Sequence, residues 1–116
     1  MANYVIAQLD GIDPVGSPCG AARRAFISRE NKVASLHVVD IHAASRVHFH
    51  KAITELYFVL QGEGHIELDR ERIPLRPYTA VMVKPGCRHR AVGELRVLVV
   101  AIPPFDPKDP DEWFDD

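Results

Sequence analysis

The sequence predicts an all-β fold, either a sandwich or a barrel. Short runs rich in valine, isoleucine, leucine, tyrosine and phenylalanine recur along the 116-residue chain, and turn-forming residues separate them. Evidence for helices is weak by comparison, so little helix is expected. Hydrophobic residues make up 47% of the chain, and its length favours one domain with one core.

Apolar runs define the expected strands, and turn chemistry defines the connections between them. Glycine, proline or aspartate occurs in the connections at 62–64, 69–72, 76–77 and 84–86. Residues 10–20 contain two prolines and three glycines and are expected to form a loop. The predicted strands are 4–8, 24–28, 34–41, 46–50, 56–60, 65–68, 79–83 and 95–102.

The chain divides into a strand-rich part, residues 1–104, and a tail, residues 105–116. Prolines at 103, 104, 107 and 110 exclude a regular helix or a central strand there. The tail ends in an acidic stretch that carries Trp113 and Phe114. Either it is a frayed terminus, or it is an arm that docks these aromatics on the barrel or on a second subunit.

Charge and composition limit the classes of partner. The net charge is -2, the pI is about 6.3, and the basic residues are scattered, so nucleic-acid binding is not expected. Two cysteines are too few for a disulfide scaffold. The N-terminus lacks the pattern of a signal peptide, and no apolar run is long enough to span a bilayer. A soluble cytoplasmic protein without a membrane partner is therefore predicted.

The segment 46–57 concentrates metal-binding chemistry. His48 and His50 share one face of a strand, about 6.6 Å apart, so two imidazoles can converge on one ion. If residues 51–54 form a hairpin loop, His50 lies opposite Glu55 and His48 lies opposite Tyr57. This register predicts three metal ligands from one hairpin.

A fourth ligand follows a predicted type II turn at 84–87. His89 would complete a set of three nitrogens and one carboxylate, leaving coordination positions free on a six-coordinate metal. The expected cofactor is one divalent transition metal, either Fe, Mn, Ni, Cu or Zn.

These residues resemble the two motifs of the cupin superfamily. His48, His50, Glu55 and Gly62 match motif one, within 46–62, while Gly86 and His89 match motif two, within 78–93. The resemblance implies a small single-domain cupin, an antiparallel jelly-roll barrel (double-stranded β-helix) with inward ligands, commonly a homodimer. The framing positions depart from the family: the chain has His42, Tyr78-Thr79 and Gly93 where glycine, Gly-Asp and asparagine are usual.

Other side chains near these motifs have two readings each. Tyr57 is either a hydrogen-bonding partner or proton donor at the site, or core. Cys87 is either an inward group near the metal or a small buried hydrophobe. Arg46, which faces the barrel by parity, either binds a substrate carboxylate or phosphate, or lies at the barrel mouth. The remaining histidines, His37, His42 and His65, are not predicted to be ligands.

Three classes of function follow from an open metal site that takes a small-molecule ligand or substrate. The first prediction is a metal-dependent, dioxygenase-like oxidoreductase in which Glu55 or Tyr57 handles protons. The second is an isomerase or lyase that acts on a sugar phosphate or small acid, with the metal as a Lewis acid. The third is a non-enzymatic module that binds metal or a small ligand. The sequence does not choose among them.

Overall fold

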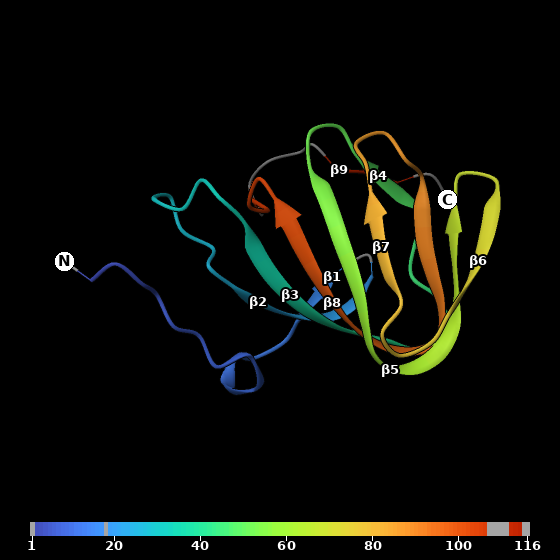
Figure 1. Ribbon diagram of the computed structural model, residues 1–116, viewed down its shortest axis with the longest axis horizontal. Coiled ribbons are helices and arrows are strands. Elements are labelled where there is room, and N and C mark those ends of the chain that lie inside the picture. The colour runs from blue at the N-terminus through green and yellow to red at the C-terminus, as the bar shows by residue number, and fades with distance from the viewer. Residues whose placement is uncertain (1, 18, 107–111, 115–116) are drawn as a thin grey trace.

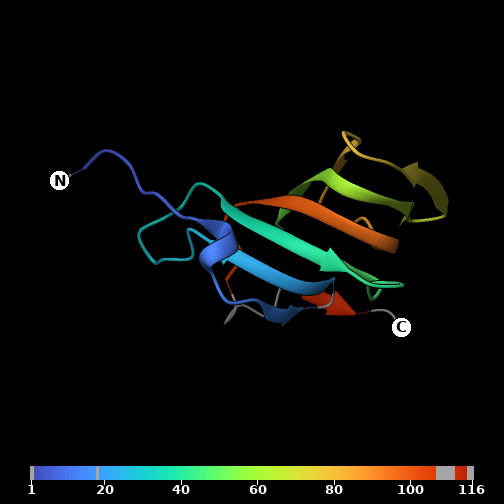
Figure 2. The ribbon, with the colours of Figure 1, turned by 90° about the horizontal axis from the view of Figure 1, so that it is seen from below.

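The protein is built almost entirely from antiparallel strands (Figures 1 and 2). The computed structural model describes residues 2–17, 19–106 and the backbone of 112–114. Among these residues, helix is limited to a 3₁₀ turn at Leu9–Gly11, so the all-β jelly-roll prediction is confirmed. The strands are β1 Val15–Ser17, β2 Gly20–Ala25, β3 Ser35–Ile41, β4 His48–His50, β5 Thr54–Leu68, β6 Glu71–Leu75, β7 Ala80–Val83, β8 His89–Ile102 and β9 Glu112–Phe114.

Two long strands, β5 and β8, hold the barrel together. They pair along their whole lengths, from Thr54 opposite Ile102 to Leu68 opposite His89. The second half of β8 lies between β5 and β3, and β2 and β1 continue that layer. The first half of β8 lies beside β4, and β9 adds to the far edge of β4. Both long strands therefore pass from one layer to the other, as the bend of β5 in Figure 1 shows.

The bend of β5 overturns the turn predicted at 62–64. Gly62 has φ +93°, and a Cβ on it would lie 2.0 Å from the Glu94 carbonyl oxygen. A register shift between Val59 and Gln61 adds to the distortion. Gly62 lets the backbones of β5 and β8 approach closely while β5 continues without a break. The predicted strands 56–60 and 65–68 are therefore one element.

Other boundaries also differ from the predictions. Residues 4–8 form no strand, because the described structure offers them no partner strand, and Tyr4, Val5 and Ile6 stay largely exposed. The loop expected at 10–20 includes β1, which forms a hairpin with β2. Strand β6 was not predicted because charged residues and Pro74 interrupt its pattern. It pairs only with β5 among the described strands, and an edge strand tolerates proline.

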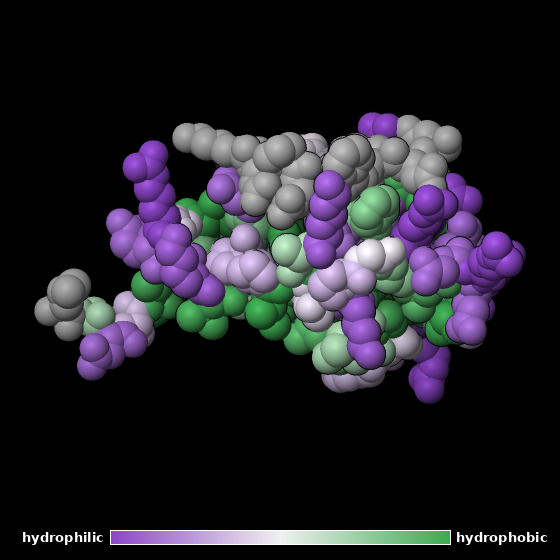
Figure 3. Space-filling view, turned by 90° about the horizontal axis from the view of Figure 1, so that it is seen from above, coloured by the Kyte–Doolittle hydropathy of each residue, from purple (hydrophilic) through white to green (hydrophobic). Residues whose placement is uncertain are grey.

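The core lies between the two layers. Alternate residues of β3 are buried, and they include Val39 and Ile41, which pack with Val59, Ile66 and Val97. The same alternation turns Ser35 and His37 inward. On the outside, Figure 3 shows hydrophobic residues gathered along one side of the molecule, continuing from the N-terminal segment, and a mixture of mainly hydrophilic residues over the other described parts of that view.

Candidate metal centre

The four predicted ligands come together inside the barrel. β4 supplies His48 and His50, β5 supplies Glu55, and β8 supplies His89. All four side chains are buried, and one ligand atom of each lies within 4.8 Å of the others. Since the ligands come from both layers, the barrel must close before the group exists.

One carboxylate oxygen ties the group together. Oε1 of Glu55 lies 2.9 Å from Nε2 of His89 and 3.2 Å from Nε2 of His50. The ring of His48 lies beside that of His89, with centroids 4.3 Å apart. Three imidazoles and one carboxylate therefore face a common point.

Backbone carbonyls set the tautomers of two of these histidines. Nδ1 of His48 donates to the Arg46 carbonyl at 3.0 Å, and Nδ1 of His89 donates to the Cys87 carbonyl at 2.9 Å. Each neutral ring then presents the lone pair of Nε2 to the cavity. In the neutral form of His89 that lone pair faces a carboxylate oxygen of Glu55 at 2.9 Å, and a cation bound by both atoms would satisfy them together. The set fits a divalent transition metal, whose histidine ligands commonly donate their other nitrogen to a carbonyl.

The pKa shifts give the same protonation states. Burial, and then the neighbouring His89, lower the pKa of His48 to about 4. For Glu55, burial raises the pKa, but the contacts of its carboxylate with the rings of His50 and His89 outweigh burial and hold the pKa well below its ordinary value. Neutral imidazole and ionised carboxylate are the forms that bind metal.

The predicted hairpin register for residues 48–57 is wrong, although the faces are right. β4 pairs with β8, at His48 opposite His89, and with β9, whereas β5 pairs with β6, β7 and β8. Glu55 and Tyr57 still point inward because they alternate along β5 with more exposed residues. They reach the two histidines of β4 from across the barrel, because β5 does not pair with β4.

A cavity of about 40 Å³ adjoins the ligands, which is room for roughly three water molecules. Cys19 lines it, with Sγ 3.7 Å from Nε2 of His48 and 3.8 Å from the Tyr57 hydroxyl. Sequence reasoning missed Cys19 because it lies in a segment interpreted as a loop, and no local signal marks it. It also set aside His37, which lines the cavity with Arg24 and Phe105.

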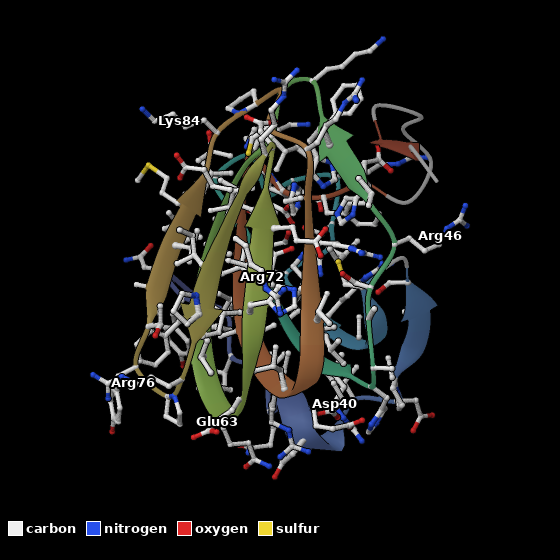
Figure 4. The ribbon with its side chains drawn as sticks, turned by 90° about the vertical axis from the view of Figure 1, so that its right-hand side faces the viewer. Asp40, Arg46, Glu63, Arg72, Arg76 and Lys84 are labelled. Atoms are coloured by element: carbon white, nitrogen blue, oxygen red, sulfur yellow. The ribbon has the colours of Figure 1, made fainter. Side chains whose placement is uncertain are left out.

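The other predicted residues are placed as follows. Tyr57 is buried at the site. Arg46 is exposed and points away from the barrel in Figure 4, because β4 begins only at His48 and the parity argument does not extend to it. Cys87 does not line the cavity; its thiol donates to the Arg88 carbonyl, and burial and Asp69 raise its pKa.

Of the remaining histidines, His42 pairs with Glu94 at 2.7 Å and His65 with Glu67 at 3.3 Å.

Comparison with known proteins identifies the family. The model of the cupin domain matches residues 35–102, which include both motifs and all four ligands. The chain is a cupin. A curated relative, the uncharacterized protein MJ1618 of Methanocaldococcus jannaschii, is 25% identical over 76 residues, which cover 62% of this chain and 61% of that protein.

Solved structures repeat the whole fold. A protein from Planctomyces limnophilus has a TM-score of 0.87 at 38% identity, over 97% of this chain and 98% of that one. The Streptomyces nucleoside dehydratase PAC13 has a TM-score of 0.80 at 16% identity, over 97% and 92%. Ectoine synthase from P. lautus has a TM-score of 0.79 at 19%, over 97% and 90%. Among the described residues, no helix has the length and apolar character that a bilayer crossing requires.

Proposed function

We propose that this cupin is a metal-dependent lyase that removes water from a small molecule bound in the barrel. The observation that carries the proposal is the buried group of three imidazoles and one carboxylate, with Tyr57 buried beside it: its ring lies 5.9 Å from that of His89, centre to centre, and its hydroxyl lies 3.8 Å from Sγ of Cys19. Two neighbours in the same fold, a nucleoside dehydratase and an ectoine synthase, support this class over the alternatives. The lyase was the second of the three predictions from sequence.

The residues have distinct roles in this proposal. His48, His50, Glu55 and His89 hold the metal, and a bound divalent ion supplies Lewis acidity to a substrate oxygen. Loss of water breaks a C–H and a C–O bond. Tyr57 donates a proton to the departing hydroxyl, because its own hydroxyl is buried at the site with Cys19 beside it, and the proton released from carbon then restores the tyrosine hydroxyl. Glu55 acts as a ligand, since an ionised carboxylate has no proton to donate.

A metal-dependent oxygenase is the second candidate. The observation that favours it is the donor set itself, because three nitrogens and one carboxylate suit Fe, Mn, Ni or Cu and leave coordination positions for other ligands. This first prediction from the sequence stays a prediction, as does the third, a binding module without catalysis.

The test begins with metal content by elemental mass spectrometry on untagged protein. Protein reconstituted with Zn(II), which has no redox chemistry, is then incubated with hydroxylated small molecules, and products lighter by one water are sought by mass spectrometry. A lyase turns over with Zn(II) and consumes no oxygen. Turnover that requires Fe(II) together with oxygen uptake would establish the oxygenase instead, and tight binding without any product would support a binding module.

Replacing Tyr57 by phenylalanine tests its role. Tyr57→Phe should lower kcat by roughly 10²- to 10⁴-fold, the usual contribution of a general acid, and leave metal content unchanged. Unchanged kcat in Tyr57→Phe would mean that the tyrosine is only part of the core.

The predicted homodimer and the cytoplasmic location stay predictions. Tyr4, Val5 and Ile6 are exposed apolar residues that a second subunit could cover, which supports a two-fold dimer. Sedimentation giving a monomer at micromolar concentration would refute the dimer.

A further inference from the structure

Two side chains outside the ligand group face the same cavity. Arg24 on β2 and His37 on β3 are direct register partners, and both line the cavity with Glu55. His37 is buried, with only 7% of its surface exposed. Neither residue belongs to a cupin motif in this sequence, and neither is needed to hold the metal.

The hydrogen-bond pattern makes His37 a donor toward the cavity. Ser35 is fully buried, and its hydroxyl accepts from the Phe105 amide at 2.9 Å. The hydroxyl proton then has one acceptor among the described residues, Nε2 of His37 at 2.8 Å. Burial and the charge of Arg24 lower the pKa of His37 to about 4, so the ring is neutral and its proton is on Nδ1. Nδ1 makes no hydrogen bond with a described residue, and the His37 side chain lines the cavity.

Arg24 brings a positive charge to the same place. Its guanidinium carbon lies 4.4 Å from the centre of the Phe105 ring, and the His37 ring lies nearly perpendicular to the same phenylalanine, with centroids 5.8 Å apart. The charged residues that line the cavity are Arg24 and Glu55, whose formal charges cancel. A divalent ion on the four ligands would therefore leave the cavity positive and suited to an anion.

We propose that Arg24 and His37 form an anion subsite that binds the carboxylate of a small organic acid next to the metal centre. A guanidinium fork and one imidazole N–H match the two oxygens of a carboxylate, and a cavity of about 40 Å³ has room for little more than such a group. The inference rests on the proposed function only in treating this acid as the substrate. The subsite itself depends on Arg24 and His37.

The test compares an acid with its neutral amide. Binding of lactate and lactamide to the full chain is measured by calorimetry, once with a chelator and once with Zn(II) bound. Lactate should bind more tightly than lactamide in both states. Arg24→Gln should weaken lactate binding by roughly 10- to 100-fold and leave lactamide unchanged. Arg72→Gln, which removes an exposed arginine on β6, is the matched control for net charge and should change neither.

A second variant tests the imidazole. His37→Phe keeps a ring beside Phe105 and removes the N–H donor, so it should also weaken lactate binding. A thermal melt shows whether this variant folds. If it does not fold, the effect of Arg24→Gln on lactate binding alone tests the subsite. Equal affinity for lactate and lactamide, or lactate binding unaffected by Arg24→Gln, overturns the subsite. Preference for lactate through Arg24 in a protein that eliminates water from no compound leaves the subsite standing and refutes the lyase.

Discussion

Two buried neutral histidines should make the metal-free protein sensitive to mild acid. His37 and His48 have pKa values lowered from 6.5 to about 4, mainly by burial, with Arg24 acting on His37 and His89 on His48. Between pH 6.5 and about 4, the unfolded chain binds protons at these two histidines and the folded chain does not. The free energy of unfolding therefore falls as the pH drops through this range. The lowered pKa of Glu55 also favours the folded state at higher pH, but this contribution is lost only as the pH falls below about 4.5, the ordinary pKa of a glutamate.

The size of the effect follows from the two pKa values. Taking protonation of the unfolded chain at 6.5 and of the folded chain at about 4, each histidine costs about 2 kcal/mol at pH 5 relative to pH 7.5. Together they should remove about 4 kcal/mol, a large part of the roughly 5–15 kcal/mol that is usual for a folded domain.

Urea unfolding followed by circular dichroism from pH 5 to 8 measures this directly, with a chelator present because metal binding adds its own pH dependence. His37→Gln should remove about half of the loss, whereas His42→Gln, at an exposed histidine on the surface, should leave the profile as it is. A free energy of unfolding that is flat across this range, or that increases toward pH 5, would refute the assignment of both histidines as buried and neutral.

Two further predictions concern the backbone around the site. A chain that ends at Asp106 lacks β9, which pairs with β4 at positions 48–50. Its metal affinity, measured by competition with a chelator, should therefore fall about 10- to 100-fold. An unchanged affinity would count against a positioning role for β9. Gly62→Ala should lower the free energy of unfolding in urea by about 3 kcal/mol or more, because the added Cβ would meet a carbonyl oxygen. Gly16→Ala is the control, since a Cβ there has nothing within 4 Å, and it should change stability by less than about 0.5 kcal/mol. Equal effects of the two substitutions would refute the close approach at Gly62.

The ligand group could be predicted from sequence because its evidence is local. Alternation along a strand places His48 and His50 on one face whatever strand lies beside them, and the spacing within the motif adds Glu55, which alternation along its own strand turns inward. Their partners could not be predicted in the same way. The pairing of His48 with His89 joins distant segments, and the hairpin assumed between β4 and β5 was wrong.

The cavity wall was missed for the same physical reason. Cys19 reaches His48 across 29 positions of the sequence, from a segment whose prolines and glycines predict only a loop. His37 lies on a correctly predicted strand, yet only the contact of Ser35 with both His37 and Phe105 shows where its proton lies. The tail aromatics Trp113 and Phe114 pair with β4 through their backbones, and their side chains lie outside the described residues.

The placement of the ligands links metal binding to the integrity of the barrel. β4 is short, and it meets β8 at His48 opposite His89, with β9 on its other edge. Two of the candidate ligands lie on this short strand, while Glu55 and His89 lie at the starts of the two strands that join the layers. An ion held by all four would tie β4 to β5 and β8, and binding only to the folded chain stabilises it in proportion to the logarithm of the metal concentration. His48, one of the two histidines that make the metal-free protein sensitive to acid, would then help to make the loaded protein the more stable form at neutral pH.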